Sequence, residues 1–123
     1  MTRILLIDDD EVEHRLIRHM LRDTMQGPYV LRYAPTVDKA LSILKTDDFD
    51  VILLDDKLGP GQNATKSVPE IRRITESVPM VLISSVIDAD HLRSKTILDV
   101  YDIVDKFQLR QRIREGLFEL DET

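Results

Sequence analysis

Two apolar runs of this chain end in carboxylates, and these acidic residues are the first candidates for chemistry. Ile4–Ile7 is followed by Asp8 and Asp9, and Val51–Leu54 is followed by Asp55. Runs of four branched apolar residues are typical of strands buried on both faces, as in a parallel sheet covered by helices. Open α/β sheets bind their ligands at the carboxyl ends of such strands. Two acidic strand ends at one edge therefore indicate a site.

Two further polar side chains follow later strand-like runs. Ser84 comes after Met80–Ile83, and Lys106 comes after a short run that begins at Asp102. Three crowded carboxylates repel one another, and a hard divalent cation with oxygen ligands relieves that repulsion. Mg²⁺ commonly adds a phosphate oxygen to its carboxylate ligands, while a lysine and a hydroxyl suit phosphoryl oxygens. The set therefore indicates a metal and a phosphoryl group, with one carboxylate as the nucleophile.

Helical patterns separate these strands, so the whole chain is predicted to fold as (βα)5. Strands that alternate with helices form a parallel sheet with right-handed crossovers. Residues 29–34 alternate weakly and are predicted to form an edge strand. The first helix is expected to follow an Asp10 cap, with a capping box to Glu13, and to end near Met25. Its apolar stripe would consist of Val12, Leu16, Ile17, Met20 and Leu21.

The later helices are predicted from caps and apolar spacing. Thr36 is expected to cap the second helix, which carries apolar residues up to Leu44. A third helix is expected to start near Ser67, because Ser67-x-x-Glu70 is a capping box and Pro69 is tolerated only in a first turn. It would continue to Val78. Residues 88–98 are predicted to be helical, and the final helix would carry the stripe Leu109, Ile113, Leu117 and Leu120.

The composition is that of one ordinary globular domain. The chain has 123 residues, 17 basic against 23 acidic side chains, and a net charge of −6. This balance disfavours a general affinity for nucleic acid or anionic membranes. The absence of cysteine excludes disulfides and thiolate metal sites. No apolar run approaches the ~20 residues of a membrane span, so we expect a cytoplasmic protein.

Several polar residues have simpler interpretations. Asp10 is better explained as a helix cap than as a ligand. Asp56 is expected to be exposed, because it should point away from Asp55. The three histidines share no metal-ligand spacing and are interpreted as surface or boundary residues.

Over essentially all of its length the chain resembles the receiver domain of bacterial two-component response regulators. The motifs are Asp8-Asp9, Asp55 in Val-Ile-Leu-Leu-Asp, Ser84 in Val-Leu-Ile-Ser-Ser, and Lys106 in Asp-Ile-Val-Asp-Lys. Four motifs in the right order, each at the end of an apolar run, make the resemblance specific. It implies a single receiver domain over residues 1–123, with the flavodoxin-like strand order 2-1-3-4-5.

The resemblance also implies the roles of the site residues. Asp55 would accept a phosphoryl group from a histidine kinase or a histidine phosphotransfer protein. Mg²⁺ would be held by Asp9, Asp55 and the Lys57 backbone carbonyl, and by Asp8 through water. Lys106 would pair with Asp55 and then with the phosphoryl group. Ser84 would move to bond a phosphoryl oxygen, which would change contacts with a downstream effector or a second copy through the fourth helix, fifth strand and fifth helix.

Some positions depart from the family pattern. Ile103 stands where an aromatic residue is usual, and Phe107 stands where a proline usually follows the lysine. Lys57 is a cation that could reach the phosphoryl group. These departures leave the acceptor chemistry intact and put the usual switch in doubt.

Two alternatives remain open. One is a pseudo-receiver that has the same fold but is regulated by protein contacts alone. The other is a haloacid-dehalogenase-like phosphatase that would use Asp8 and Asp10, although its second acidic motif should follow the lysine rather than precede it. In the favoured interpretation the protein is a phosphoacceptor with at most slow self-hydrolysis, not a multiple-turnover enzyme, and no effector domain is expected after the last helix.

Overall fold

The protein is built on one five-stranded sheet, as a computed structural model describing residues 1–119 shows. All strands are parallel, in the order β2-β1-β3-β4-β5. The predicted α/β class and flavodoxin-like strand order are therefore confirmed. β2 lies at one edge, as its weak alternation indicated. The strands are β1 (Thr2–Ile7), β2 (Tyr29–Ala34), β3 (Val51–Asp55), β4 (Met80–Ser84) and β5 (Asp102–Asp105).

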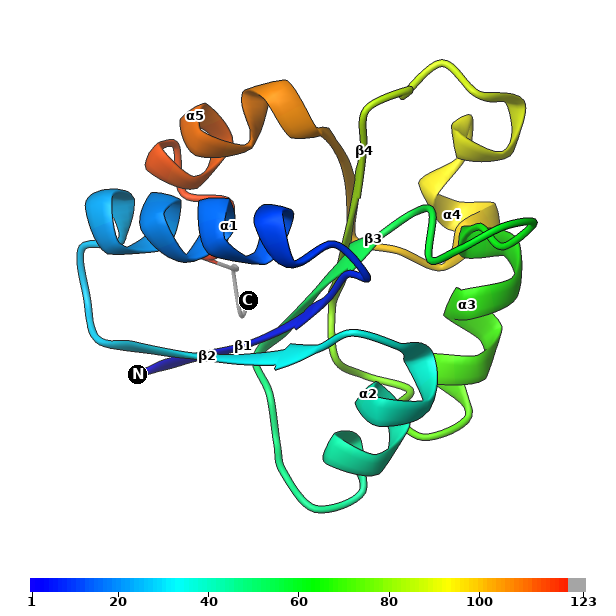
Figure 1. The fold of residues 1–123 in the computed structure, drawn as a ribbon, viewed down its shortest axis with the longest axis horizontal. Helices are drawn as coiled ribbons and strands as arrows, with labels where there is room; N and C mark the ends of the chain where they lie inside the picture. Colours follow the sequence, from blue (N-terminus) through cyan, green and yellow to red (C-terminus); the bar gives the residue numbers. More distant parts are fainter. Residues whose placement is uncertain (120–123) are drawn as a thin grey trace.

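Helices cover both faces of the sheet. α1 and α5 lie on one side, and α2, α3 and α4 lie on the other (Figure 1). Two short 3₁₀ turns, η1 and η2, precede α4 and α5. The helical elements are α1 (Glu11–Thr24), α2 (Val37–Leu44), α3 (Ala64–Arg72), η1 (Asp90–Leu92), α4 (Lys95–Leu98), η2 (Lys106–Gln108) and α5 (Leu109–Arg114).

The central strands feed two separate cores because successive side chains point to opposite faces. In β3, Ile52 and Leu54 pack on the α2–α4 side, whereas Val51 and Leu53 pack on the α1–α5 side. Every residue of β3 and β4 is buried. Two covered faces explain why these strands are continuous apolar runs rather than alternating ones.

The Asp10 cap of α1 was predicted correctly, but its capping box to Glu13 and part of its apolar stripe were not. The capping box does not form because the Asp10 N–H donates to Asp8 instead. The Asp10 carboxylate accepts the Val12 N–H at 2.9 Å, as expected of an N-cap. Ile17 and Leu21 are buried, whereas Val12 and Leu16 are 58% and 51% exposed. At roughly 100° per residue, both lie too far around the helix from Ile17 to reach the sheet. Five apolar residues therefore span more than the face that α1 buries.

The prediction for α3 was wrong at both ends. The helix begins at Ala64 because Asn63 caps it, with its side-chain oxygen accepting the Thr65 N–H at 2.9 Å. Pro69 therefore lies inside the helix rather than in its first turn. The helix ends at Arg72, not near Val78.

The turn after α3 is held by the Arg72 side chain. Its guanidinium donates to the backbone carbonyl of Val78 at 2.6 Å and to that of Asp99 at 3.1 Å. These bonds connect the end of α3 to the starts of β4 and β5, and the chain between 73 and 79 is thereby fixed without continuing the helix.

The segment 88–98 was predicted as one helix and forms two short pieces instead. η1 covers three residues and α4 four. Ser94 has an extended backbone between them and its hydroxyl accepts the Ile97 N–H at 3.1 Å, so it starts a new helix rather than continuing the old one. Asp99, in the left-handed conformation with φ of 61°, ends α4.

The final helix, α5, ends at Arg114 and is therefore shorter than the range spanned by its predicted apolar stripe. Leu109, Ile113 and Leu117 are buried as expected. Leu120 lies outside the described residues. None of the helices in the described part of the chain has the length and hydropathy that a membrane crossing requires.

Candidate functional site

The acidic cluster is assembled by the pairing of β1 with β3. Their register places Ile7 beside Leu54, so Asp8 and Asp55 leave neighbouring strands at the same height. Asp8 is fully buried and Asp55 is 5% exposed, whereas Asp9 is exposed. One oxygen from each of the three carboxylates lies within 4.8 Å of the others. The three acids singled out in the sequence therefore lie together.

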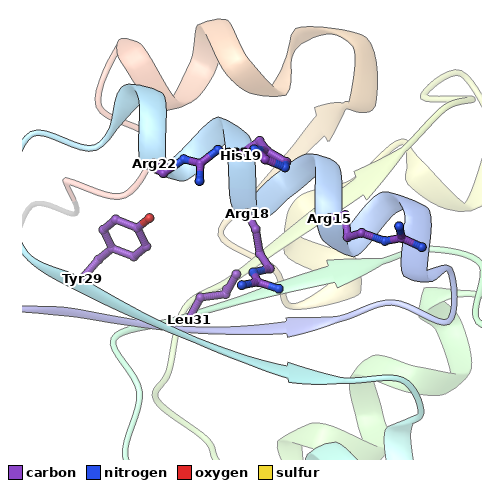
Figure 2. Close-up of a pocket in the computed structure, with 6 residues that line it drawn as sticks. All are labelled: Arg15, Arg18, His19, Arg22, Tyr29 and Leu31. Carbon is purple, nitrogen blue, oxygen red and sulfur yellow. Dashed lines mark hydrogen bonds between the residues drawn. The ribbon is translucent and has the colours of Figure 1, made fainter.

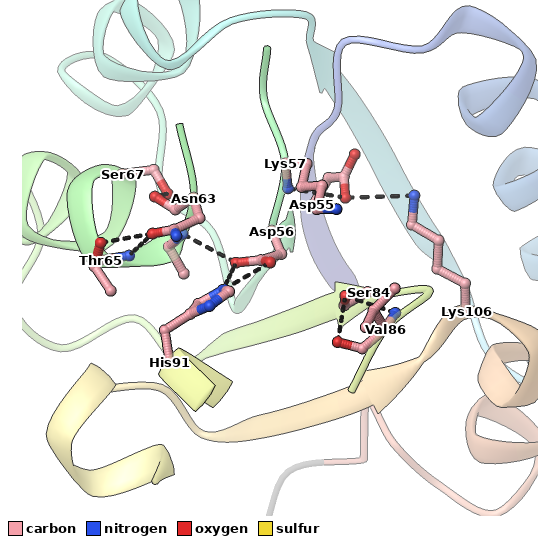
Figure 3. Close-up of polar contacts among 11 residues, drawn as sticks. Asp55, Asp56, Lys57, Asn63, Thr65, Ser67, Ser84, Val86, His91 and Lys106 are labelled. Carbon is pink, nitrogen blue, oxygen red and sulfur yellow. Dashed lines mark hydrogen bonds and ion pairs between the residues drawn. The ribbon is translucent and has the colours of Figure 1, made fainter. Parts of the chain in front are cut away.

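Lys106 approaches this cluster from the end of β5. Its Nζ lies 3.3 Å from an Asp55 oxygen and 3.4 Å from an oxygen of Glu13, and Figure 3 shows the lysine pointing at Asp55. Burial alone would lower the pKa of Lys106, but the charges of Asp55, Glu13 and Asp8 outweigh it and raise that pKa. The lysine is therefore a fixed cation at this site.

Sequence reasoning missed the contact that Glu13 makes with this lysine. Glu13 lies in the first turn of α1, where an acid is common because it favours the helix dipole. The local pattern therefore gave no sign that the side chain reaches across to Lys106.

Burial dominates the titration of the two buried acids. It raises the pKa of Asp8 from 3.8 to about 7; the Asp10 N–H, donating to Asp8 Oδ1 at 2.9 Å, lowers this pKa in part, and the nearby Asp55 charge raises it further. Burial also raises the pKa of Asp55, against the opposing effect of Lys106. Both carboxylates thus sit where negative charge is costly without a nearby cation.

The donor set suits a hard divalent cation. Within residues 1–119, the second oxygen of Asp8 is buried and has no hydrogen-bond partner. A buried oxygen without a partner, beside two further carboxylates, offers the all-oxygen ligands that Mg²⁺ takes. The residues present therefore fit a magnesium ion.

Ser84 reaches the same edge of the sheet but is engaged elsewhere. The β4–β5 register pairs it with Asp105, the residue before Lys106. The Ser84 hydroxyl accepts the Val86 N–H at 3.0 Å and donates to the Val86 carbonyl at 3.3 Å (Figure 3). Its hydroxyl therefore caps the turn that follows β4.

Asp56 was expected to be exposed, and that prediction was wrong. The residue does point away from Asp55, but the opposite face of the sheet is covered, and Asp56 is only 1% exposed. Its carboxylate accepts the Ala64 N–H at 3.0 Å and contacts the His91 ring nitrogen Nε2 at 2.9 Å. His91 is a boundary residue, as expected, but its bond to Asp56 was not foreseen.

The positions that depart from the family pattern lie around this edge. The Lys57 side chain is exposed, and its backbone N–H donates to Asp55 Oδ1 at 3.4 Å. Ile103 is half-buried and packs against the core on the α2–α4 side. Phe107 is 86% exposed.

A second concave surface lies away from the acids. It is a cavity of about 370 Å³ between α1 and the edge strand β2, and Figure 2 shows arginines on the helix above Tyr29 and Leu31. Burial and the neighbouring Arg18 and Arg15 charges lower the pKa of His14 on the same helix. Among the described residues, the lining of this cavity includes no acid and no member of the candidate site, so the two are separate. It is lined by Arg15, Arg18, His19, Arg22, Tyr29 and Leu31.

Comparison with known families identifies the family to which this fold belongs. Residues 4–117 match the response regulator receiver domain. This range includes most of β1, all of the other strands, and the positions of all the candidate site residues. The chain belongs to this family. A receiver domain belongs to two-component, phosphorelay signalling, and receiver domains bind Mg²⁺ at an acidic pocket.

Solved receiver structures share the whole fold at low sequence identity. A chemotaxis protein of Vibrio cholerae is 18% identical with a TM-score of 0.80, over 98% of this chain and 99% of that one. The signal receiver domain of an HD-domain protein from Pseudomonas fluorescens is 24% identical with a TM-score of 0.77, over 96% and 85%. The receiver domain of a sensor histidine kinase from Pseudomonas aeruginosa, which holds a magnesium ion in its active-site cleft, is 22% identical with a TM-score of 0.74, over 97% and 98%.

One curated relative is similar at the sequence level. The glycerol metabolism activator of Pseudomonas putida is 31% identical over 86 residues, which is 69% of this receiver domain. The match covers only 38% of that activator. The similarity thus concerns less than half of the relative's length.

Proposed function

We propose that this receiver domain accepts a phosphoryl group on Asp55 from a phosphohistidine of a sensor histidine kinase or a histidine phosphotransfer protein. A carboxylate oxygen would attack phosphorus, the phosphorus–nitrogen bond would break, and the imidazole would leave, which gives an acyl phosphate. The observation that carries the proposal is the position of Asp55, a buried carboxylate among other acids with a lysine 3.3 Å away.

The neighbouring side chains have distinct parts in this proposal. Lys106 holds a positive charge beside the Asp55 oxygen and then beside the transferred group. Ser84 donates to a phosphoryl oxygen after its hydroxyl leaves Val86. We assign metal binding to Asp8, Asp9, Asp55 and the Lys57 backbone carbonyl, and a bound Mg²⁺ would neutralise charge on the phosphoryl oxygens.

The output of the reaction is a change in protein contacts rather than turnover of a small substrate. The receiver would act as a phosphoacceptor with slow self-hydrolysis, and residues 1–123 would form one receiver unit. A downstream effector, or a second copy of the chain, would bind the surface of α4, β5 and α5. Ser84 lies at the start of the segment that leads to α4, which supports a coupling between phosphorylation of Asp55 and the shape of this surface.

The test is chemical labelling of the purified protein. After incubation with acetyl phosphate and Mg²⁺, intact-mass measurement should show the gain of one phosphoryl group. Asp55→Asn should abolish the adduct, and removal of Mg²⁺ with a chelator should reduce it strongly. Asp10→Asn is the matched control, because asparagine is an equally good N-cap and Asp10 lies outside the acidic cluster.

Each outcome separates the alternatives. An adduct that depends on Asp55 supports the acceptor, and complete absence of an adduct favours the pseudo-receiver. Repeated turnover of a small phosphoester that requires Asp8 and Asp10 would favour the phosphatase. Against the phosphatase, the Asp10 carboxylate is already bonded to the backbone at the start of α1.

A further inference from the structure

The Asp56 carboxylate joins two segments that are far apart in the sequence. It is almost fully buried, accepts the Ala64 N–H at the start of α3, and contacts His91 Nε2 at 2.9 Å through both of its oxygens. An ionised carboxylate can only accept hydrogen bonds, so the His91 N–H donates. Figure 3 shows Asp56 and His91 facing each other on the side of β3 opposite Asp55.

The segment 85–91, which runs from the end of β4 into η1, is held by polar contacts near its two ends. At the start, the Ser84 hydroxyl bonds the backbone N–H and carbonyl of Val86. At the far end, His91 bonds Asp56, and the adjoining Leu92 is buried. Residues 85–88 between these anchors are exposed. These two side-chain contacts, together with the packing of Ala89 and Leu92 on the core, hold this stretch in place.

We propose that Asp56 and His91 form a positioning pair that holds segment 85–91 in the arrangement in which Ser84 bonds Val86, and so opposes phosphorylation of the adjacent Asp55. The inference rests on the proposed function of Asp55. The two aspartates are consecutive, so one strand end carries both the acceptor and the anchor of the segment that has to move. A shift in the backbone at either aspartate therefore reaches the other through a single peptide unit.

The physical reason for the opposition is competition for one short segment. The Ser84 hydroxyl must leave Val86 before it can bond a phosphoryl oxygen, and this displaces the chain just after β4. The His91 bond holds the same chain five residues beyond Val86, so the displaced arrangement is less populated while the bond lasts. The apparent rate of a step that needs a minor arrangement falls with the population of that arrangement.

The test compares variants on this one segment. His91→Leu removes the donor from a half-buried position, and phosphorylation by acetyl phosphate should become about three- to tenfold faster, the range expected for loss of one such bond. His91→Gln keeps an N–H donor of similar reach and should restore the wild-type rate. Arg93→Leu is the control, since Arg93 is exposed and pairs only with the exposed Asp90 among the described residues.

A second measurement makes the result independent of phosphorylation. Hydrogen exchange of residues 85–91 in the unmodified protein should accelerate in His91→Leu and remain unchanged in Arg93→Leu and His91→Gln. Unchanged exchange in His91→Leu would show that the bond between His91 and Asp56 does not hold the segment in place. Faster exchange with an unchanged or slower labelling rate would overturn the coupling to Asp55. A failure of the proposed function is distinct, because then neither wild type nor any variant would be labelled on Asp55.

Discussion

Asp8 is a carboxylate at a position where negative charge is unfavourable. It is fully buried, and one of its oxygens has no partner within the described chain. A helix cap or a surface acid would find water or an N–H, whereas Asp8 is buried beside two further carboxylates. The position is therefore unfavourable for the metal-free protein and favourable for binding a cation.

The stability of the metal-free protein should consequently depend on pH through Asp8. Its pKa is about 7 in the folded protein and 3.8 in an ordinary setting, so the folded state holds the extra proton between these values. The sign follows: the free energy of unfolding falls as pH rises from about 4 through about 7, and it levels off above. Asp8→Asn should remove this fall and stabilise the metal-free protein at about pH 8 by roughly 2–4 kcal/mol.

Urea unfolding with a chelator present, at about pH 5 and about pH 8, measures this effect. Asp10→Asn removes a neighbouring charge outside the cluster and should keep the wild-type dependence. An equal fall in stability for wild type and Asp8→Asn would show that another group is responsible.

At the residue scale, sequence analysis predicted the converging acids and the pairing of Lys106 with Asp55, but it missed the contacts of Glu13 with Lys106 and of Asp56 with His91. Asp8, Asp55 and Lys106 follow apolar strands, and parallel strands bring their ends together whatever the details of packing. Asp56 was misjudged because alternation tells which face a side chain takes, not what covers that face. Its partner His91 is 35 residues away, and no local pattern connects the two.

At the element scale, the strands were predicted better than the helices. A strand covered on both faces must be apolar throughout, so its sequence is distinctive. α3 and the segment before β5 depend instead on single side chains. Asn63 and Asp56 together fix the start of α3, by accepting the N–H groups of Thr65 and Ala64. The nearby Ser67 and Glu70 had offered a plausible but wrong alternative.

Substitution of the observed cap should therefore weaken α3. Asn63→Ala removes the acceptor for the Thr65 N–H and should lower the free energy of unfolding by about 1 kcal/mol. Asn63→Asp keeps a capping oxygen and should stay close to wild type. Denaturant unfolding measures both. If Ser67→Ala were the more damaging change, the helix would start where the capping box first suggested.

At the scale of the whole molecule, charge is unevenly distributed. The chain carries a net charge of −6, yet three carboxylates crowd one edge of the sheet while three arginines line the cavity between α1 and β2. A cation should bind most favourably at the acidic edge, because it would relieve the repulsion among the three carboxylates there. Because β1 and β3 both contribute to this edge, we expect cation binding there to stabilise the fold as a whole.

Magnesium should accordingly raise the melting temperature. At a hundredfold excess over its dissociation constant, the gain is about 2.7 kcal/mol, or roughly 8–16 °C for a domain of this size. Asp9→Asn should reduce the shift sharply, and its exposed position makes misfolding an unlikely cause. Asp10→Asn should retain the shift. Thermal unfolding with and without Mg²⁺ measures it, and a flat response in wild type would contradict the metal site.

The strand order has a consequence for how the protein folds. β1 pairs with β3, and the register joins Ile4 to Val51, which are more than a third of the chain apart. Closing so long a loop is slow compared with forming a helix or a hairpin, so these two strands meet late. Asp8 and Asp55 come together only at that moment. The repulsion between the carboxylates therefore opposes the late pairing of β1 with β3. It does not oppose the earlier formation of local structure in α1 and α2.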